Sequence, residues 1–132
     1  LVNAVHDVSE GGVACAAAEM ALSSNVGVAL YPENMMSREE DHLVAELLFG
    51  ESQARFVLAM PSVRWTEIVT TQKALLTENG LADIGVFGKK IESEDEEPKI
   101  SILSASHDWA VPLSTLRAAH EGWLPAYMKG AM

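Results

Sequence analysis

Two short signatures constrain the fold of this chain most, because each concentrates glycines, hydroxyls and ionisable groups at the end of an apolar segment. The first is His-Asp-Val-Ser-Glu-Gly-Gly at residues 6–12, and the second is Leu-Phe-Gly-Glu-Ser-Gln-Ala-Arg at residues 48–55. Glycines let a backbone turn sharply and approach a ligand closely, and the free amides at a helix N-terminus attract anions. The pair therefore predicts two element ends suited to a charged ligand.

The apolar pattern around these signatures predicts a mixture of helices and strands. Strands are expected at residues 2–8, 26–31, 55–60, 82–91 and 99–103, and helices at 13–22, 39–48, 65–79 and 111–120, with a short terminal segment at 123–128. The acidic stretch at residues 92–98 is interpreted as a solvated hairpin loop rather than a cation or basic-partner site. This order predicts an α+β fold in which helices pack against one mostly antiparallel sheet.

Size and charge limit the classes of protein to which the chain can belong. With 132 residues, 48% of them hydrophobic, residues 1–132 are expected to form a single domain. The chain opens on Leu1 in an apolar run, which suggests a piece of a longer polypeptide. A net charge of -10 argues against nucleic acid or an anionic membrane as a partner, because basic residues supply that attraction. One cysteine and no apparent signal peptide favour a cytoplasmic location.

The first signature supplies one group of candidate site residues, namely His6, Asp7, Ser9, Gly11 and Gly12. They lie between a predicted strand and a predicted helix N-terminus, where backbone amides form a plausible ligand edge. On spacing alone an ordinary structural role is favoured, in which Asp7 and Ser9 cap the helix and His6 fills a hydrogen-bonding position in the core. The chain contains neither a P-loop nor a dinucleotide-binding glycine motif.

The second signature supplies the candidates for a phosphate or substrate site, which are Gly50, Glu51, Ser52, Gln53 and Arg55. A carboxylate, a hydroxyl, an amide and a guanidinium on one glycine-containing loop are suited to phosphate or sugar hydroxyls. On sequence alone a plain helix-to-strand connection is slightly favoured, in which Glu51 and Arg55 satisfy each other. One carboxylate does not make a metal site, so no metal ligand is assigned, and no catalytic residue is identified.

The remaining reactive side chains are interpreted as structural. No histidine among His42, His107 and His120 has a partner at metal-ligand spacing, so these are expected to be surface or capping residues. Cys15, on the alanine-rich helix, is expected to be a small core residue rather than a nucleophile. The pair Met35 and Met36 and the indole of Trp109 are expected to pack onto the core rather than to mark an interaction surface.

With both signatures in place, the chain resembles the C-terminal domain of the aminoimidazole ribonucleotide synthetase superfamily. That superfamily carries a version of the first signature, and the second is similar to the form found in its phosphoribosylformylglycinamidine synthase family, in the large synthetase subunit called component II. The Ala-Ala-Glu-Met-Ala-Leu run at 17–22, the strand at 85–89 and the Glu-Gly-Trp-Leu-Pro tail at 121–125 add to the resemblance. The family often has glycine where this chain has Ala54, which puts close contact with a ligand there in doubt.

The resemblance implies a domain of an ATP-dependent ligase of purine synthesis, which converts formylglycinamide ribonucleotide to formylglycinamidine ribonucleotide with glutamine-derived ammonia. ATP and Mg²⁺ are then expected to bind mainly outside this chain, in N-terminal domains of the same polypeptide, and glutamine hydrolysis is expected in a separate glutaminase domain or subunit. Gly50, Glu51, Ser52 and Arg55 are expected to help hold a phosphorylated ligand, and His6, Asp7 and Ser9 to shape the cleft against the N-terminal domain. Alone, the domain is expected to be inactive.

Two other functions remain open from the sequence. One is a related ATP-dependent enzyme of the superfamily, such as a selenophosphate synthetase, although the second signature argues against it. The other is a noncatalytic structural or interaction copy of the domain, since one tandem half in the resembling family is thought to serve structurally.

Overall fold

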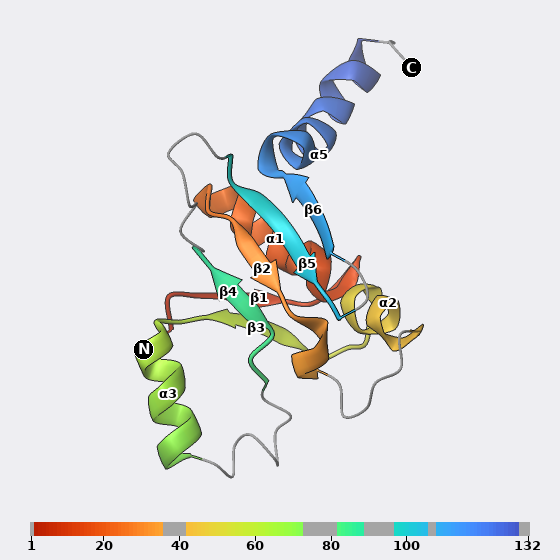
Figure 1. The fold of residues 1–132 in the computed structure, drawn as a ribbon. Helices are drawn as coiled ribbons and strands as arrows, with labels where there is room; N and C mark the ends of the chain where they lie inside the picture. The colour runs from red at the N-terminus through yellow and green to blue at the C-terminus, as the bar shows by residue number, and fades with distance from the viewer. Residues whose placement is uncertain (1, 36–41, 73–81, 89–96, 106–107, 130–132) are drawn as a thin grey trace.

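The computed structural model describes residues 2–35, 42–72, 82–88, 97–105 and 108–129 (Figure 1). In chain order the elements are β1 (Ala4–Asp7), α1 (Gly12–Ser24), β2 (Val28–Leu30), the 3-10 helix η1 (Pro32–Met35), α2 (His42–Phe49), β3 (Phe56–Ala59), α3 (Ser62–Thr71), β4 (Gly85–Phe87), β5 (Lys99–Leu103), β6 (Asp108–Pro112) and α5 (Leu113–Met128). The expected α+β class is therefore confirmed. In this part of the chain, no helix is both long and apolar enough to cross a membrane.

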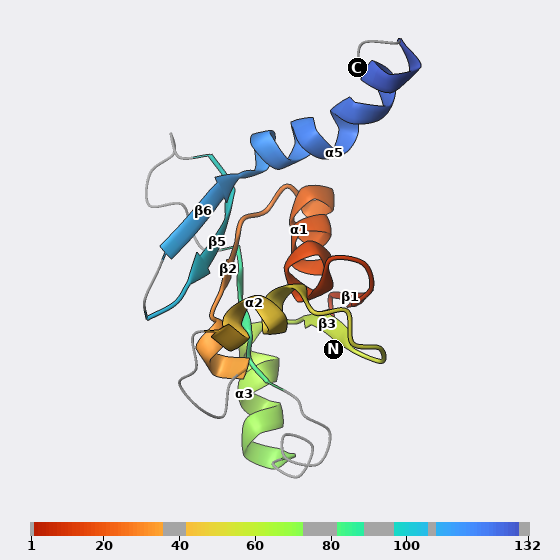
Figure 2. The same ribbon diagram turned by 90° about the vertical axis from the view of Figure 1, so that its right-hand side faces the viewer.

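The strands form two sheets rather than one. β1 and β3 make an antiparallel two-stranded ribbon, and β4, β2, β5 and β6 follow one another in a four-stranded sheet. Within the latter, β2 runs parallel to β5 while the other two neighbouring pairs are antiparallel, so antiparallel pairing predominates as expected. Figure 2 shows α1 packed against one side of the four-stranded sheet and α5 projecting beyond the rest of the molecule.

The predicted hairpin between the strands near residues 82–91 and 99–103 is wrong. β4 and β5 do not pair with each other, because β2 lies between them and pairs with both. All three residues of β2 are buried, and a short, wholly apolar strand is typical of the centre of a sheet. Most of the acidic stretch at 92–98 lies outside the described residues.

The C-terminal elements also differ from the prediction. Residues 108–112 form the edge strand β6 along β5, and α5 then runs without a break through the segment expected to be separate. At the boundary between β6 and α5 the Leu113 amide donates to the Pro98 carbonyl at 2.8 Å. The Ser114 amide, in the first turn of the helix, donates to the Glu97 carboxylate at 2.9 Å. Hydrogen bonds from the Ser114 hydroxyl and then from the Ser114 amide lower the pKa of Glu97, since a hydrogen bond to the carboxylate favours its charged form.

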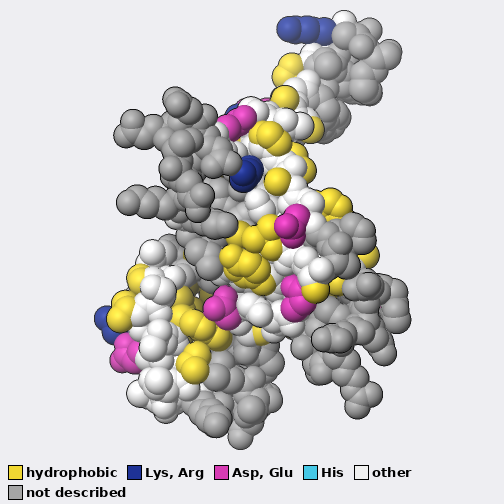
Figure 3. All heavy atoms as spheres, in the orientation of Figure 1, with side chains coloured by type: hydrophobic (Ala, Val, Ile, Leu, Met, Phe, Trp, Pro, Cys, Tyr) yellow, Lys and Arg dark blue, Asp and Glu magenta, His cyan; other side chains and the backbone are white. Residues whose placement is uncertain are grey.

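The core forms around α1, because its small alanine side chains allow close packing on two sides of the helix. Ala14, Ala17 and Ala21 pack with the four-stranded sheet, α2 and α5, whereas Val13, Ala16 and Met20 pack with Val8 and Val57 of the ribbon side. By contrast α3, which begins at Ser62 rather than 65, buries none of its residues fully. Hydrophobic side chains are visible along α3 and over the four-stranded sheet in Figure 3. The last part of the helix expected over 65–79 lies outside the described residues.

Candidate functional site

The first signature forms the turn between β1 and α1. Gly11 is the residue before the helix, with φ 75°, and Gly12 has φ 69°, so both occupy the left-handed region that favours glycine. The expected side-chain cap from Asp7 or Ser9 is wrong, because no side-chain cap hydrogen bond is made at Gly11. The two left-handed glycines reorient the chain here, and the Gly12 amide donates to the Ser9 carbonyl at 3.2 Å.

His6 links this turn to the body of α1. Its Nδ1 lies 2.6 Å from the Asp7 carbonyl oxygen, and its Nε2 lies 2.9 Å from a carboxylate oxygen of Glu19. The His6 side chain is 27% exposed and that of Asp7 is 73% exposed. The expected hydrogen-bonded position for His6 is confirmed, although it is half-buried at the edge of the core, while Asp7 faces solvent.

The second signature forms the turn between α2 and β3, and Arg55 holds it together. The guanidinium donates to the carbonyls of Leu47 at 3.5 Å, of Ser52 at 3.2 Å, and of Gly50. The Leu47 carbonyl lies in the last turn of α2, where carbonyls lack helical partners, and the Gly50 and Ser52 carbonyls lie in the turn that follows. Ala54 has φ 62°, so the turn geometry by itself accounts for a preference for glycine at this position.

The two signatures meet, although 40 residues separate the atoms that join them. The Gly11 amide donates to Glu51 Oε1 at 2.9 Å, and the Val8 amide donates to the Arg55 carbonyl at 2.9 Å. Gly12 lies so close to the second turn that a Cβ there would stand 2.6 Å from the Leu48 carbonyl oxygen. The suggested pairing of Glu51 with Arg55 is wrong, since each has a different partner. We call this contact region the signature junction.

Cys15 and Glu19 also belong to the signature junction, and sequence reasoning missed both. Cys15 is exposed, so its expected role as a core residue is wrong; the alanines around it fill the core instead. Partial burial, together with the carboxylates of Glu19 and Glu51, raises the pKa of the thiol. A helix places residues four apart on one face. The spacing from Gly11 to Cys15 to Glu19 could therefore have indicated that these residues lie on the same side of α1.

The signature junction is acidic. The carboxylates of Asp7, Glu10 and Glu51 are exposed, whereas the nearby guanidinium of Arg55 already donates to three carbonyls. Among the described residues, no three His, Cys, Asp or Glu side chains are grouped so as to hold a metal ion. The Gly11 amide is bonded to Glu51 rather than free for an anion.

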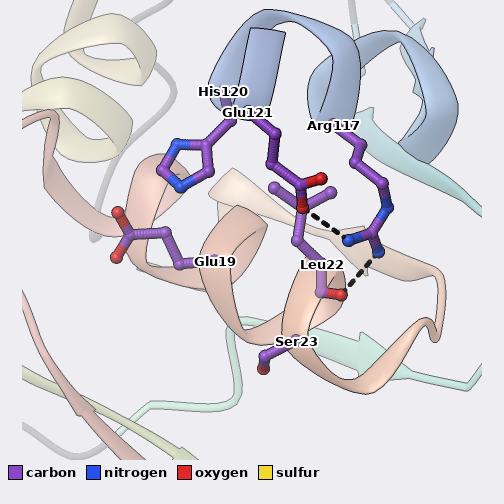
Figure 4. A pocket seen from close by; sticks show the side chains of 6 residues that line it. All are labelled: Glu19, Leu22, Ser23, Arg117, His120 and Glu121. Atoms are coloured by element: carbon purple, nitrogen blue, oxygen red, sulfur yellow. Dashed lines mark hydrogen bonds and ion pairs between the residues drawn. The ribbon is translucent and has the colours of Figure 1, made fainter. Parts of the chain in front are cut away.

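A separate shallow hollow of about 280 Å³ lies between α1 and α5. Its lining consists of Glu19, Leu22, Ser23, Arg117, His120 and Glu121 (Figure 4). Arg117 bridges the two helices by donating to the Leu22 carbonyl at 2.8 Å and to Glu121 at 2.8 Å. His120 is exposed, as expected, and points toward Glu19 in Figure 4. The hollow contains none of the predicted site residues.

The remaining sequence candidates are placed as follows. Ser9, Ser52 and Gln53 lie exposed on the two turns, and Gly50 ends α2 by donating its amide to the Glu46 carbonyl at 2.8 Å. Trp109 lies 51% exposed on β6, so its expected packing into the core is wrong, because β6 is the edge strand. His107 and Met36 lie outside the described residues, as do the side-chain positions of His42 and Met35.

Comparison with known proteins identifies a family and several relatives that are similar to this chain. The family described as AIR synthase related protein, C-terminal domain, matches residues 1–100. Two relatives called phosphoribosylformylglycinamidine synthase subunit PurL are 34% identical over 95% of this chain in Parvibaculum lavamentivorans and 38% identical over 97% of it in Caulobacter vibrioides. The chain spans 14% of the length of each of these relatives.

Solved structures show the same fold. The structure described as Thermotoga maritima PurL complexed with ATP aligns with a TM-score of 0.63 at 25% identity, over 88% of this chain and 19% of that one. The same protein complexed with FGAR aligns with a TM-score of 0.61 at 23% identity, over 88% of this chain and 18% of that one. The architecture described above therefore recurs as one part of a much longer protein.

Proposed function

The chain belongs to the AIR synthase related proteins through their C-terminal domain, and we propose that it serves as one domain of a phosphoribosylformylglycinamidine synthase. The name of the relatives supports this activity, because the relatives match nearly the whole of this chain. Since the chain spans 14% of their length, the reaction belongs to the longer protein. Residues 1–132 are then a single C-terminal synthetase-like domain within it.

The proposed reaction forms a carbon–nitrogen bond with ATP as the second substrate. The amide oxygen of formylglycinamide ribonucleotide attacks the terminal phosphorus of ATP. The bond between that phosphorus and ADP breaks, and ADP is released. Ammonia then attacks the same carbon, and the carbon–oxygen bond breaks with release of phosphate to give the amidine. We assign glutamine hydrolysis, Mg²⁺ and the main nucleotide contacts to other domains or subunits, and we place the enzyme in the cytoplasm.

Within that enzyme, the signature junction is the part of this domain that faces the ligand. The observation that carries this assignment is the hydrogen bond from the Gly11 amide to Glu51, because it fixes the two signatures as one surface. Arg55 holds the second turn in shape through backbone carbonyls, while the hydroxyls of Ser9 and Ser52 and the amide of Gln53 stay exposed on that surface. Exposed hydroxyl and amide groups are suited to ribose hydroxyls or phosphate oxygens.

The test is an ammonia-dependent assay on the full-length protein, following ADP and the amidine product. Glu51→Ala removes the acceptor of the Gly11 amide, and a hydrogen bond to a charged group is worth about 1.5–3 kcal/mol. We therefore expect kcat/KM for formylglycinamide ribonucleotide to fall about 10- to 100-fold. The matched control is Glu67→Ala, which breaks a surface pair with Arg64 at 2.7 Å on α3 and leaves activity unchanged.

Full activity of Glu51→Ala would remove the signature junction from the reaction. No amidine formation by the unmutated full-length protein, with nucleotide binding retained, would favour the second candidate, a noncatalytic structural copy. One observation points that way: Glu51 already occupies the amide that an anionic ligand would use.

A further inference from the structure

The ribbon of β1 and β3 has one buried face and one open face. Directly opposite residues of an antiparallel pair share a face, and the register pairs Val5 with Leu58 and Asp7 with Phe56. We call these four residues the ribbon face. Val5 is 60% exposed, Phe56 63% and Leu58 37%, whereas Val57, which points to the opposite side, is 3% exposed and packs with α1.

Such a ribbon is incomplete as a structural unit. A two-stranded sheet is marginal in water by itself, and in the described part of the chain β1 and β3 pair only with each other. Its buried side already supports α1, so further stabilisation has to come from the ribbon face. Three large apolar side chains in a row on one face are typical of a covered surface rather than of scattered exposure.

The ribbon face also runs directly into the signature junction. Asp7 ends the first strand inside one signature, and Phe56 follows Arg55 of the other. At this end the exposed carboxylates of Asp7, Glu10 and Glu51 collect negative charge, and the Arg55 guanidinium is already engaged with backbone carbonyls. A surface that covers the ribbon face would complement this charge with lysine or arginine.

We propose that the ribbon face is the docking surface for another domain of the same polypeptide, which presents an apolar strip to Val5, Leu58 and Phe56 and a basic side chain to Asp7. This inference rests on the proposed function, because it requires the longer protein. The docked domain would add positive charge to the edge of a ligand site where the Arg55 guanidinium is engaged with backbone carbonyls.

The small area of the ribbon face favours a covalently linked domain over a second copy of the chain as the partner. Three side chains supply a few hundred Å², well below the roughly 800 Å² per partner of a stable complex between separate proteins. A covalent linker raises the effective concentration of a neighbouring domain to about the millimolar range, so a small patch suffices. The relatives leave ample length for such a domain, since this chain spans 14% of them.

The experiment measures thiol labelling at single positions in the full-length protein, mapped by peptide mass spectrometry. Leu58→Cys reports on the ribbon face, and Val63→Cys, at a position 69% exposed on α3, is the matched control. We expect the Leu58→Cys thiol to react about tenfold more slowly than the control, which corresponds to an opening free energy of about 1.4 kcal/mol. Asp7→Asn, added to Leu58→Cys, should raise the labelling rate by weakening the charge contact.

Equal labelling at positions 58 and 63 would overturn the proposal, and so would protection that appears only as the protein concentration rises, which indicates a second copy. If Asp7→Asn leaves the labelling rate of Leu58→Cys unchanged, the proposed contact between Asp7 and a basic side chain is overturned. Hydroxyl-radical footprinting of Phe56 in the unmodified protein repeats the test without any substitution in the fold. Protection without amidine formation leaves the interface standing and removes the proposed function, whereas activity without protection does the reverse.

Discussion

The contact between the two signatures depends on the missing side chain at Gly12, so Gly12→Ala tests it directly. A Cβ at this position would stand 2.6 Å from the Leu48 carbonyl oxygen, 2.7 Å from the Phe49 carbonyl carbon and 2.8 Å from the Gly50 carbonyl oxygen. All three are backbone atoms, which cannot move aside as a flexible side chain can. The backbone at Gly12 is also left-handed, with φ 69°.

The cost of Gly12→Ala has two parts. A residue with a Cβ in the left-handed region costs about 1–2 kcal/mol, and forcing extra atoms into a packed region costs about 1–3 kcal/mol. We therefore expect the free energy of unfolding to fall by about 2–5 kcal/mol. This is a large fraction of the total stability of a domain of this size.

Substitutions at two other glycines separate the two parts of this cost. Gly88 has φ 70°, but its nearest neighbour would be Val26 Cγ1 at 3.5 Å, so Gly88→Ala should show the left-handed cost alone, about 1–2 kcal/mol. Gly122, inside α5, would meet nothing within 4 Å, so Gly122→Ala should stabilise the helix by about 1 kcal/mol. Urea unfolding followed by circular dichroism gives all three values, provided that the m-value is unchanged. A loss for Gly12→Ala no larger than that for Gly88→Ala would refute the close approach of the two turns.

Three further changes test the core, the second turn and the start of α5. Leu48→Ala should lower the free energy of unfolding by about 2–5 kcal/mol because Leu48 is 1% exposed, whereas Phe49→Ala, at a position 52% exposed, should cost less than about 1 kcal/mol; equal urea midpoints would contradict this packing. Arg55→Lys should cost about 1–3 kcal/mol and speed limited proteolysis of the turn between α2 and β3, since an ammonium cannot reproduce the guanidinium fork; an unchanged cleavage rate would show that the turn does not need the fork. The pKa of Glu97 is lowered by its bonds to Ser114, so its stabilising effect is complete above the ordinary glutamate pKa of about 4.3 and is lost as the pH falls through the lower folded value. Thermal unfolding of the unmutated protein and Glu97→Gln should therefore differ near neutral pH and converge in acid, and a constant difference would exclude this contact as the cause.

Much of the local structure follows from the sequence. The alanine-rich run at 13–22 lies within α1, Gly50 ends α2, and the strand expected at 99–103 is observed with the same bounds. Periodicity, caps and breakers act over a few residues, so they can be read from the chain directly. The α+β class follows from the same local information.

The sequence does not reveal which strands pair. Short apolar segments carry little information about their neighbours, so the central position of β2 and the edge strand β6 emerge only in the sheet. The predicted hairpin failed because β2 inserts between β4 and β5. Likewise, Trp109 is exposed because β6 lies at an edge, which nothing in its own segment indicates.

The candidate site shows the same division. Sequence alone identified the two signatures and the residue types that suit a ligand, because those are properties of short segments. Only the tertiary structure decided that Gly11 donates to Glu51, that Arg55 binds carbonyls of its own turn, and that Cys15 lies exposed beside Gly11. The physical reason is that a hydrogen-bond partner 40 residues away is selected by the pairing of β1 with β3 and by the packing of α1 against α2, which no local pattern encodes.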